Sequence, residues 1–490
     1  MIGPSRSGKT VNVISGLRLG RLRPSRVSVK RTSSTPPSSS AHAPGRWRCS
    51  DPAGITGIKP EHLTCWVTAT SRADTPSGAQ KAAAALRSVD PAPGSMAART
   101  TGCPRPRFSF TGLLATASLN PGLTMEDVAT WVSSPRTCRS KAVELTVIKD
   151  ITAAADGDDD AAHDRARWAI KQLDAVWKLD ERVRSSVYAT LQTVVKPWLD
   201  PTVASSAERV IDEDGEIVTP FIDLDWLNAG PNTLYLVAPL ADQVRFSPVL
   251  GGLIGDLKDQ AYQLDVSGGH LARPLLMVID EAGNMPLSWL PEVASTCAGI
   301  GILLVTIWQS KAQLDAAYGK LADSVLTNHL TKIVFAGCSD ASTLDYVSRL
   351  LGDEEVQRRS VTFDTSGGSG RRSVSEGPQR EALAPFHLLR QAEPGHAILI
   401  HGTLPPAHLQ ARRYWQEQPA PPRWWRRGTA DSSPAGQSAC PAGHVPTSAG
   451  QPETPSSTAL FASEGGSRDG ARDRGWSRWL RRTSRQGATR

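Results

Sequence analysis

The stretch Gly3-Pro4-Ser5-Arg6-Ser7-Gly8-Lys9-Thr10 lies near the start of this 490-residue chain and fits the pattern G-x-x-x-x-G-K-[ST]. The backbone N–H groups of such a turn, opening onto the N-terminus of a helix, form a cradle for a phosphate chain. Lys9 would reach the β- and γ-phosphates, and the hydroxyl of Thr10 would bind Mg²⁺. Residues 3–10 therefore predict a nucleoside triphosphate site, with a glycine-rich surface turn as the simpler alternative.

The residues around this loop partly support the prediction. Residues 11–17 have apolar positions at helical spacing, as expected of the helix that the loop should open. The preceding strand is reduced to Met1-Ile2, whereas a strand needs about five residues. We therefore expect either a weakly anchored loop or a chain that begins late relative to its fold.

A second candidate element follows residues 274–279, which run apolar directly into Asp280-Glu281. A continuous apolar run of this length is typical of a strand buried on both faces of a parallel sheet. The two acids then lie at its carboxyl end, where open α/β sheets bind ligands. Asp280 is suited to hold Mg²⁺ through water, and Glu281 to orient and deprotonate an attacking water. The alternative is an ordinary strand end with two solvated acids.

Charge and cysteine content narrow the class of protein. The net charge is +7, but the first 50 residues hold ten Lys and Arg and no acid, so the basic character is regional. The seven cysteines are scattered without a C-x-x-C pair, which argues against a zinc site or a disulfide framework and favours a reducing compartment. No apolar run approaches the roughly 18 residues of a membrane helix. We expect a cytoplasmic protein.

The chain divides by composition into five segments. Residues 1–20 would start a nucleotide-binding domain, and 206–415 would continue it. Residues 21–112 are rich in Ser, Pro, Ala, Gly and Arg without lasting periodicity, so we expect them to be largely irregular. Residues 113–205 show helical periodicity and predict a small all-α domain, with a helix capped at Thr124. Residues 416–490 are expected to form a disordered basic tail.

Beyond residue 205, short apolar runs alternate with helical patterns, which predicts a parallel sheet with helices on both faces. The fold class is therefore α/β, with an inserted all-α domain. The expected strands are residues 234–237, 275–279, 302–307, 332–335 and 397–400. The expected helices between them include residues 248–264 and 339–351, and residues 364–375 are expected to form a polar loop.

Together with the loop and the acidic pair, the segment Gln309-Ser310-Lys311-Ala312-Gln313-Leu314 makes the chain resemble the type IV secretion coupling proteins, the TraG/TraD-like ATPases of conjugation with a TraM-recognition domain. The likeness covers about residues 1–19 and 113–410. It implies a RecA-like P-loop NTPase fold that uses ATP and Mg²⁺. It also implies that Gln309 senses the γ-phosphate, because an amide can donate to a phosphate oxygen and accept from water.

The resemblance further implies a homo-hexamer that moves single-stranded DNA, with a relaxosome protein and channel components of type IV secretion as partners. The chain would then lie at the inner face of the membrane through those partners. Residues 423–427 and 474–482 of the tail combine Arg with Trp, which can bind single strands, although a solvated tail or a lipid contact is as plausible.

Three departures from the family pattern bear on function. We expect the chain to lack the family's membrane helices and most of the first strand, and residues 297–301 hold no cation where an arginine is expected. Residues 21–112 do not resemble the expected second strand, which either a shifted reading frame or an insertion would explain. Besides a DNA motor, the sequence therefore leaves open an impaired coupling-protein remnant that acts as an interaction module, and a small-molecule P-loop enzyme.

Overall fold

The computed structural model describes residues 1–4, 7, 9, 25–30, 46–55, 57–58, 63–66, 73, 75–87, 105–119, 123–134, 148, 152, 160–207, 222–239, 243–364 and 371–411. The chain forms two units, Met1–Arg412 and Arg413–Arg490. The second unit, and with it the expected tail, lies outside the described residues. Within the described ranges, no helix is both long and apolar enough to cross a membrane.

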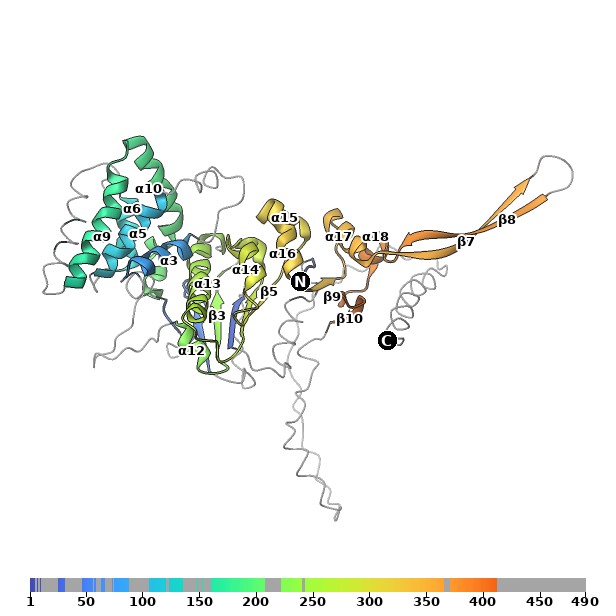
Figure 1. Cartoon of the computed structure of the whole chain (residues 1–490), viewed down its shortest axis with the longest axis horizontal. Coiled ribbons are helices and arrows are strands. Elements are labelled where there is room, and N and C mark those ends of the chain that lie inside the picture. Colours follow the sequence, from blue (N-terminus) through green and yellow to red (C-terminus); the bar gives the residue numbers. More distant parts are fainter. Residues whose placement is uncertain are drawn as a thin grey trace, which may run out of the picture. The chain divides into compact units, whose positions relative to one another are not determined.

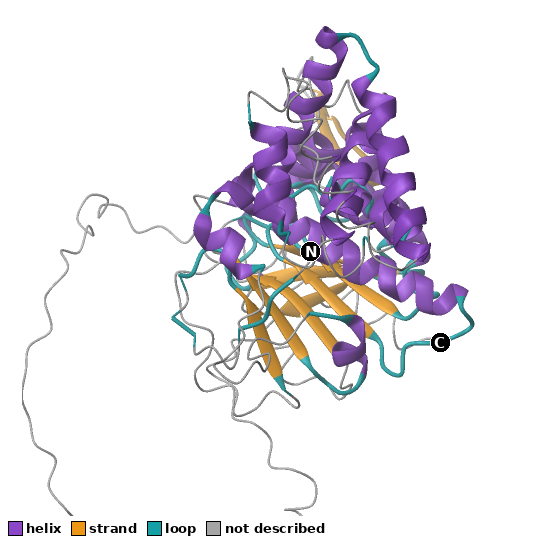
Figure 2. Ribbon diagram, turned by 90° about the vertical axis from the view of Figure 1, so that its left-hand side faces the viewer, coloured by secondary structure: helices purple, strands orange, loops and turns teal. Residues whose placement is uncertain are grey.

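A five-stranded parallel sheet with the order β2-β3-β1-β4-β5 forms the first layer of the fold (Figures 1 and 2). Its strands are β1 (Ser25–Lys30), β2 (Trp47–Ser50), β3 (Thr233–Val237), β4 (Leu275–Ile279) and β5 (Ile302–Thr306). The apolar runs of β3 and β4 are almost entirely buried, as a strand covered on both faces requires. The predicted α/β class is confirmed.

A second sheet continues the first one through Ile2. Its order is β10-β9-β6, with β6 at Thr331–Phe335, β9 at His396–His401 and β10 at Ala407–Gln410. Ile2 forms parallel bridges to Trp308, just beyond β5, and to Val334 on β6. Trp308 donates its backbone N–H to the Met1 carbonyl at 2.8 Å, and Ile2 donates to Ile333 at 2.9 Å. The short Met1-Ile2 segment is therefore paired on both sides.

One expectation for this region was wrong. Residues 397–400 were expected to extend a parallel sheet, whereas β9 runs antiparallel to β6. Ala336, which follows β6, donates its N–H to the carbonyl of His396 at the start of β9. The chain therefore returns to the edge at which β6 ends, and β9 has to run back in the opposite direction.

Residues 21–112 were expected to be largely irregular, and this expectation was wrong for three segments. They form β1, β2 and the helix α3 (Pro76–Leu86). β1 lies between β3 and β4 in the sheet, so it takes the place for which the sequence indicates no strand. Its six residues contain only two valines, and the Ser- and Pro-rich flanks hide so short a signal. Pairing with β3 and β4, which are remote in sequence, determines this strand.

Residues 63–66 attach this region to the longest helix of the described chain, α13 (Gln243–Val266). Trp66 is buried and donates its indole N–H to Asp256 on α13 at 3.2 Å. Gly252 faces the same ring, since a Cβ there would lie 2.6 Å from the Cη2 atom of Trp66. The glycine thus lets the indole pack directly on the helix backbone.

The helical region contains α5 (Arg105–Leu119), α6 (Met125–Ser133), α9 (Asp160–Trp177), α10 (Glu181–Val195), the 3₁₀ turn Lys196–Leu199 and α11 (Pro201–Ser206). The predicted cap of α6 is present, because the carboxylate of Asp127 accepts from the backbone N–H of Thr124 at 2.7 Å. α5 begins at residue 105 rather than 113. The remaining helices are α12 (Leu224–Asn228), α14 (Leu290–Thr296), α15 (Lys311–Tyr318), α16 (Ala322–Asn328), α17 (Ala341–Leu351) and α18 (Phe386–Gln391).

An antiparallel ribbon of β7 (Asp353–Asp364) and β8 (Arg371–Ala382) follows α17 (Figure 1). The polar loop expected at residues 364–375 is wrong at Asp364 and at residues 371–375, which belong to β7 and β8. Cross-strand ion pairs join Arg359 to Glu376 at 3.3 Å and Arg380 to Glu355 at 3.9 Å. Charged pairs of this kind stabilise opposing strands without an apolar face, so the ribbon carries no hydrophobic alternation by which it could be predicted.

Candidate nucleotide site

Three strand ends of the two sheets point toward one place. Ile2 leads into the glycine-rich loop, β4 ends at Asp280-Glu281, and β5 leads through Trp308 to Gln309. Ile2 is parallel to the strand at Trp308, and β5 is parallel to β4, so all three segments end at the same edge. This carboxyl edge is where α/β sheets bind ligands.

The described part of the loop is closely packed. A Cβ on Gly3 would lie 2.7 Å from the Cβ of Phe335 and 2.8 Å from the hydroxyl oxygen of Ser7, so only glycine fits. The Ser7 hydroxyl is buried and has no hydrogen-bond partner among the described residues. A buried donor without a partner is costly, and an incoming anion would satisfy it. Of the predicted loop residues, Ser5, Arg6, Gly8 and Thr10 lie outside the described residues, as does the expected helix at 11–17.

Lys9 is buried, with 9% of its surface exposed. Its ammonium donates to the carbonyl of Gly3 and, at 2.6 Å, to that of Pro4. Burial lowers the pKa of Lys9, and the negative charge of Asp280 opposes this shift, with smaller contributions from Cys338 and Glu281. The loop lysine and both acids of the doublet therefore share one electrostatic environment.

The acidic pair lies at a strained turn after β4. Glu281 has φ +53° and ψ 44° and is the non-glycine residue with positive φ in the described chain. Its backbone N–H donates to the Asp280 carboxylate at 3.0 Å, and its own carboxylate accepts from the side-chain amide of Asn284 at 2.9 Å. A left-handed glutamate costs about 1–3 kcal/mol, and such strain is concentrated at functional sites.

Gln309 follows the end of β5 and is half-buried. Its backbone N–H donates to the side-chain carbonyl oxygen of Gln313 at 3.0 Å. The hydroxyl of Ser310 in turn accepts from the Gln313 backbone N–H at 3.1 Å, which caps α15. Gln309, the predicted sensor, therefore lies just before α15, and Gln313 of that helix holds the Gln309 backbone in place.

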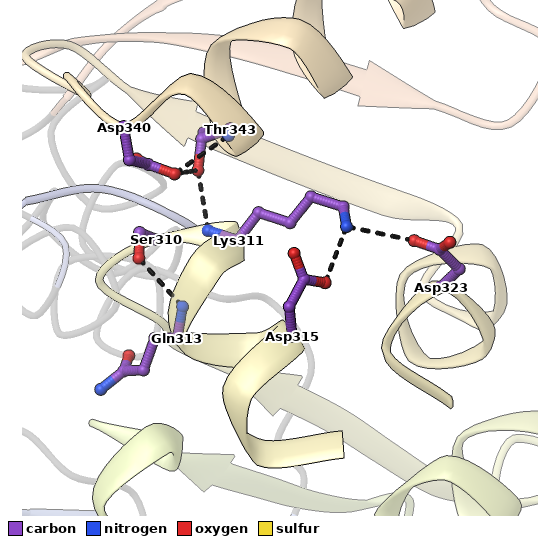
Figure 3. A network of polar contacts seen from close by, with 7 residues as sticks. All are labelled: Ser310, Lys311, Gln313, Asp315, Asp323, Asp340 and Thr343. Atoms are coloured by element: carbon purple, nitrogen blue, oxygen red, sulfur yellow. Dashed lines mark hydrogen bonds and ion pairs between the residues drawn. The ribbon is translucent and has the colours of Figure 1, made fainter. Parts of the chain in front are cut away.

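A polar network fixes the same helix start to α17 (Figure 3). The backbone N–H of Lys311 donates to the hydroxyl of Thr343 at 2.7 Å, and that hydroxyl donates to Asp340 at 2.7 Å. The Lys311 ammonium contacts the carboxylates of Asp315 at 2.7 Å and Asp323 at 3.3 Å. Its pKa is raised because these two carboxylates outweigh the opposing effect of burial.

The structure brings together the described members of the predicted site, which are Gly3, Pro4, Ser7, Lys9, Asp280, Glu281 and Gln309. Sequence reasoning missed the supporting residues Asn284, Gln313, Asp340 and Thr343. Asn284 lies three residues after Glu281, which it contacts, and Gln313 belongs to the Gln-Ser-x-x-Gln-Leu segment. Both residues could therefore have been identified from their position in the sequence. The pair Asp340 and Thr343 indicates only a helix cap in the sequence.

The donors at this edge fit the phosphate groups of a nucleotide. Lys9 supplies a cation, Ser7 a buried hydroxyl, and Gly3 the close backbone approach that a phosphate loop needs. Asp280 supplies an oxygen ligand of the kind that Mg²⁺ prefers, and Mg²⁺ usually takes only one or two carboxylates beside phosphates and water. The residues therefore fit the phosphate groups of a nucleotide together with Mg²⁺.

The carboxyl edge of this parallel sheet carries a loop of the phosphate-binding pattern, two acids after β4 and a glutamine after β5. These features define the chain as an α/β protein of the RecA-like P-loop class. Comparisons with known proteins agree. Residues 274–394 match the family model for the "TraM recognition site of TraD and TraG". The chain resembles the type IV secretion coupling proteins of conjugation.

Two relatives and one solved structure illustrate the likeness. The conjugal transfer protein TraG of Agrobacterium fabrum is 27% identical over 31% of this chain and 23% of its own length. The protein VirD4 of Rhizobium rhizogenes is 24% identical over 45% of this chain and 31% of its own. The plasmid coupling protein TrwB, solved with ADP and Mg²⁺, has a TM-score of 0.54 and 16% identity, with 85% of each chain covered. The chain thus spans less than a third of the length of TraG and of VirD4.

Proposed function

We propose that this chain is an ATP-binding coupling protein that hydrolyses ATP to move single-stranded DNA, or a protein–DNA complex, toward a conjugative type IV secretion channel. A relaxosome protein, the channel components and further copies of the chain in a hexameric ring would be its partners. The resemblance to TraG, VirD4 and TrwB supports this assignment, and TrwB was solved with ADP and Mg²⁺.

The observation that carries the proposal is the shared environment of Lys9 and Asp280. The carboxylate raises the pKa of the loop lysine against the effect of burial, and the loop and the acidic pair follow segments that end at the same edge of the sheet. A glycine-rich loop and an acidic strand end that meet in this way are the two halves of a phosphoryl-transfer site.

Each residue then has one chemical task. Lys9 and the loop backbone hold the phosphates, with Ser7 as a further donor, while Asp280 and Thr10 would hold Mg²⁺, which neutralises charge on the phosphate oxygens. Glu281, kept in place by Asn284, accepts a proton from the attacking water. Gln309 donates to the terminal phosphate.

Measuring ATP hydrolysis with and without single-stranded DNA tests the proposal. Stimulation by DNA is the expected result. Lys9→Ala should abolish binding and turnover, and Glu281→Gln should abolish turnover while nucleotide stays bound. Retained hydrolysis in both variants would show that the site lies elsewhere, and turnover that ignores DNA would favour an enzyme acting on a small molecule.

A non-catalytic interaction module is the second candidate. Residues 297–301, which precede β5, contain no cation that a neighbouring copy could receive. An arginine supplied in this way can accelerate hydrolysis by about 10³-fold or more. Nucleotide binding without turnover, with or without DNA, would favour this second function.

A further inference from the structure

One side chain, Gln313, touches two of the three strand ends at the site. Its side-chain carbonyl oxygen accepts a hydrogen bond from the backbone N–H of Gln309, three residues after the end of β5, at 3.0 Å. The same amide lies against Gly283, in the turn that follows the acidic pair: a Cβ built there would overlap the Cδ, Nε2 and Cγ atoms of Gln313. Gln313 therefore lies between the acidic turn and the sensor segment.

The closeness of Gly283 and Gln313 is specific to this pair. The φ of Gly283 is not in the left-handed region, so the backbone there does not itself demand glycine. The requirement comes from the amide that crosses over it. An alanine at position 283 would have to displace the Gln313 side chain and with it the acceptor of the Gln309 N–H.

The start of α15 is held firmly enough for such a contact to matter. Ser310 caps the helix by accepting the Gln313 N–H, and the neighbouring Lys311 N–H is bound to the buried hydroxyl of Thr343 (Figure 3). Gln313 completes this arrangement on the side of the acidic turn. The backbone N–H of Ala282, beside Glu281, donates to the carbonyl of Ile307 at 3.0 Å, and Gln313 adds to this link the hydrogen bond to Gln309 and the contact with Gly283.

We propose that Gln313 is a positioning residue. By holding the backbone of Gln309, it sets the distance between the Gln309 side-chain amide and the acidic turn, so that the site distinguishes a nucleoside triphosphate from a diphosphate. The inference rests on the proposed function, because it assigns Gln309 to the terminal phosphate. Displacing an amide from its hydrogen-bonding geometry by about 1 Å is enough to reduce turnover by up to about 10²-fold.

The test compares the full chain with Gln313→Ala, Gly283→Ala and the double variant. Affinities for fluorescent ADP and for a fluorescent, non-hydrolysable ATP analogue are measured beside the rate of hydrolysis. Both single variants should lower the preference for the triphosphate and kcat by about tenfold, while ADP affinity stays within about twofold of wild type. The double variant should lose no more than either single one, since the methyl group added at position 283 then meets no glutamine side chain.

Two matched controls use the same substitutions elsewhere. Gln263→Ala removes an exposed glutamine from α13, and Gly377→Ala adds a Cβ that meets nothing within 4 Å. Neither should change the nucleotide preference. Thermal unfolding of every variant shows whether the fold is retained.

The outcomes separate the two claims. A wild type that binds neither nucleotide overturns the proposed function, and the inference with it. A wild type that prefers the triphosphate, with an equal preference in Gln313→Ala, overturns only the role of Gln313. Equal losses for both nucleotides with a lowered unfolding temperature would also contradict it, because they indicate a merely structural contact.

Discussion

Asp280 opposes the effect of burial on Lys9: its carboxylate raises the pKa of an ammonium that desolvation lowers. The two residues come from opposite halves of the chain and from different strand ends of the sheet. Their proximity follows from the insertion of Met1-Ile2 between Trp308 and β6, which directs the loop to the edge where β4 also ends.

The affinity for nucleotide should fall at alkaline pH earlier than an ordinary lysine would allow. Phosphate binds the protonated ammonium, and the pKa of Lys9 in the free protein is lowered from 10.5. Binding is therefore complete below that lowered pKa and is lost as pH rises through it. Titrating the affinity for an ATP analogue between about pH 7 and pH 10 checks this. Lys9→Arg, which stays charged, should remove the alkaline decline; a decline unchanged in that variant would contradict the assignment.

Glu281→Gly should separate stability from activity. Glycine adopts φ +53° without strain, so the variant should be as stable as wild type or more stable by up to about 1 kcal/mol, although it loses the contact with Asn284. Hydrolysis should disappear. Urea unfolding measures the first effect and turnover the second. A large destabilisation would mean that the glutamate side chain supports the turn more than its backbone strains it.

Thr343→Val should destabilise the protein by about 1–3 kcal/mol. The substitution keeps the shape of the side chain but leaves the Lys311 N–H, which now donates to the buried Thr343 hydroxyl, without its acceptor. Thr343→Ser retains the hydroxyl and is the matched control. Chemical unfolding of the three proteins checks the difference, and equal stability of the valine variant would show that water replaces the hydroxyl at no cost.

Gly252→Ala tests whether residues 63–66 pack on α13. The new Cβ would lie 2.6 Å from the Trp66 ring, so we expect a loss of about 1–3 kcal/mol in the free energy of unfolding. Gly377→Ala, with open space around it, should be close to neutral. If Gly252→Ala instead stabilised the protein, as an alanine in a helix otherwise would, the packing of Trp66 on this helix would be refuted.

His329 should make the protein less stable in mild acid. Burial lowers its pKa from 6.5, with Lys332 adding to the effect, and its ring nitrogens face the carbonyl of Val325 and the hydroxyl of Thr306. The unfolded chain then binds a proton more readily, so stability falls as pH drops below 6.5 toward the lowered pKa. Urea midpoints at several pH values check this. His329→Gln should show a shallower decline, and an identical pH profile would contradict the prediction.

Much of the second half of the fold follows from local patterns. The strands β3, β4, β5 and β6 lie within a residue of their predicted bounds, because each contains a short apolar run, which β3 and β4 bury almost entirely. Helix α17 ends at Leu351, before Gly352, as the Leu-Leu-Gly sequence indicates. These elements depend on their own residues and were accessible to sequence reasoning.

Other elements had no local signal. β1 has too few apolar residues to stand out from its Ser- and Pro-rich surroundings, and the β7–β8 ribbon is held by cross-strand pairing and ion pairs rather than by a hydrophobic face. The direction of β9 depends on where the preceding ribbon and α18 return the chain. In each case the deciding contacts join residues that are far apart in sequence.

For the candidate site, the amino-acid sequence alone determined which residue types could bind phosphate and metal: the glycine-rich loop, the acidic doublet and the glutamine after β5. Tertiary structure decided that Lys9 lies in the electrostatic field of Asp280 and Glu281, that Glu281 takes a left-handed conformation, and that Gln313 crosses over Gly283. The physical reason is that residue chemistry is local, whereas the distances on which a site depends are set by the pairing of strands from remote parts of the chain.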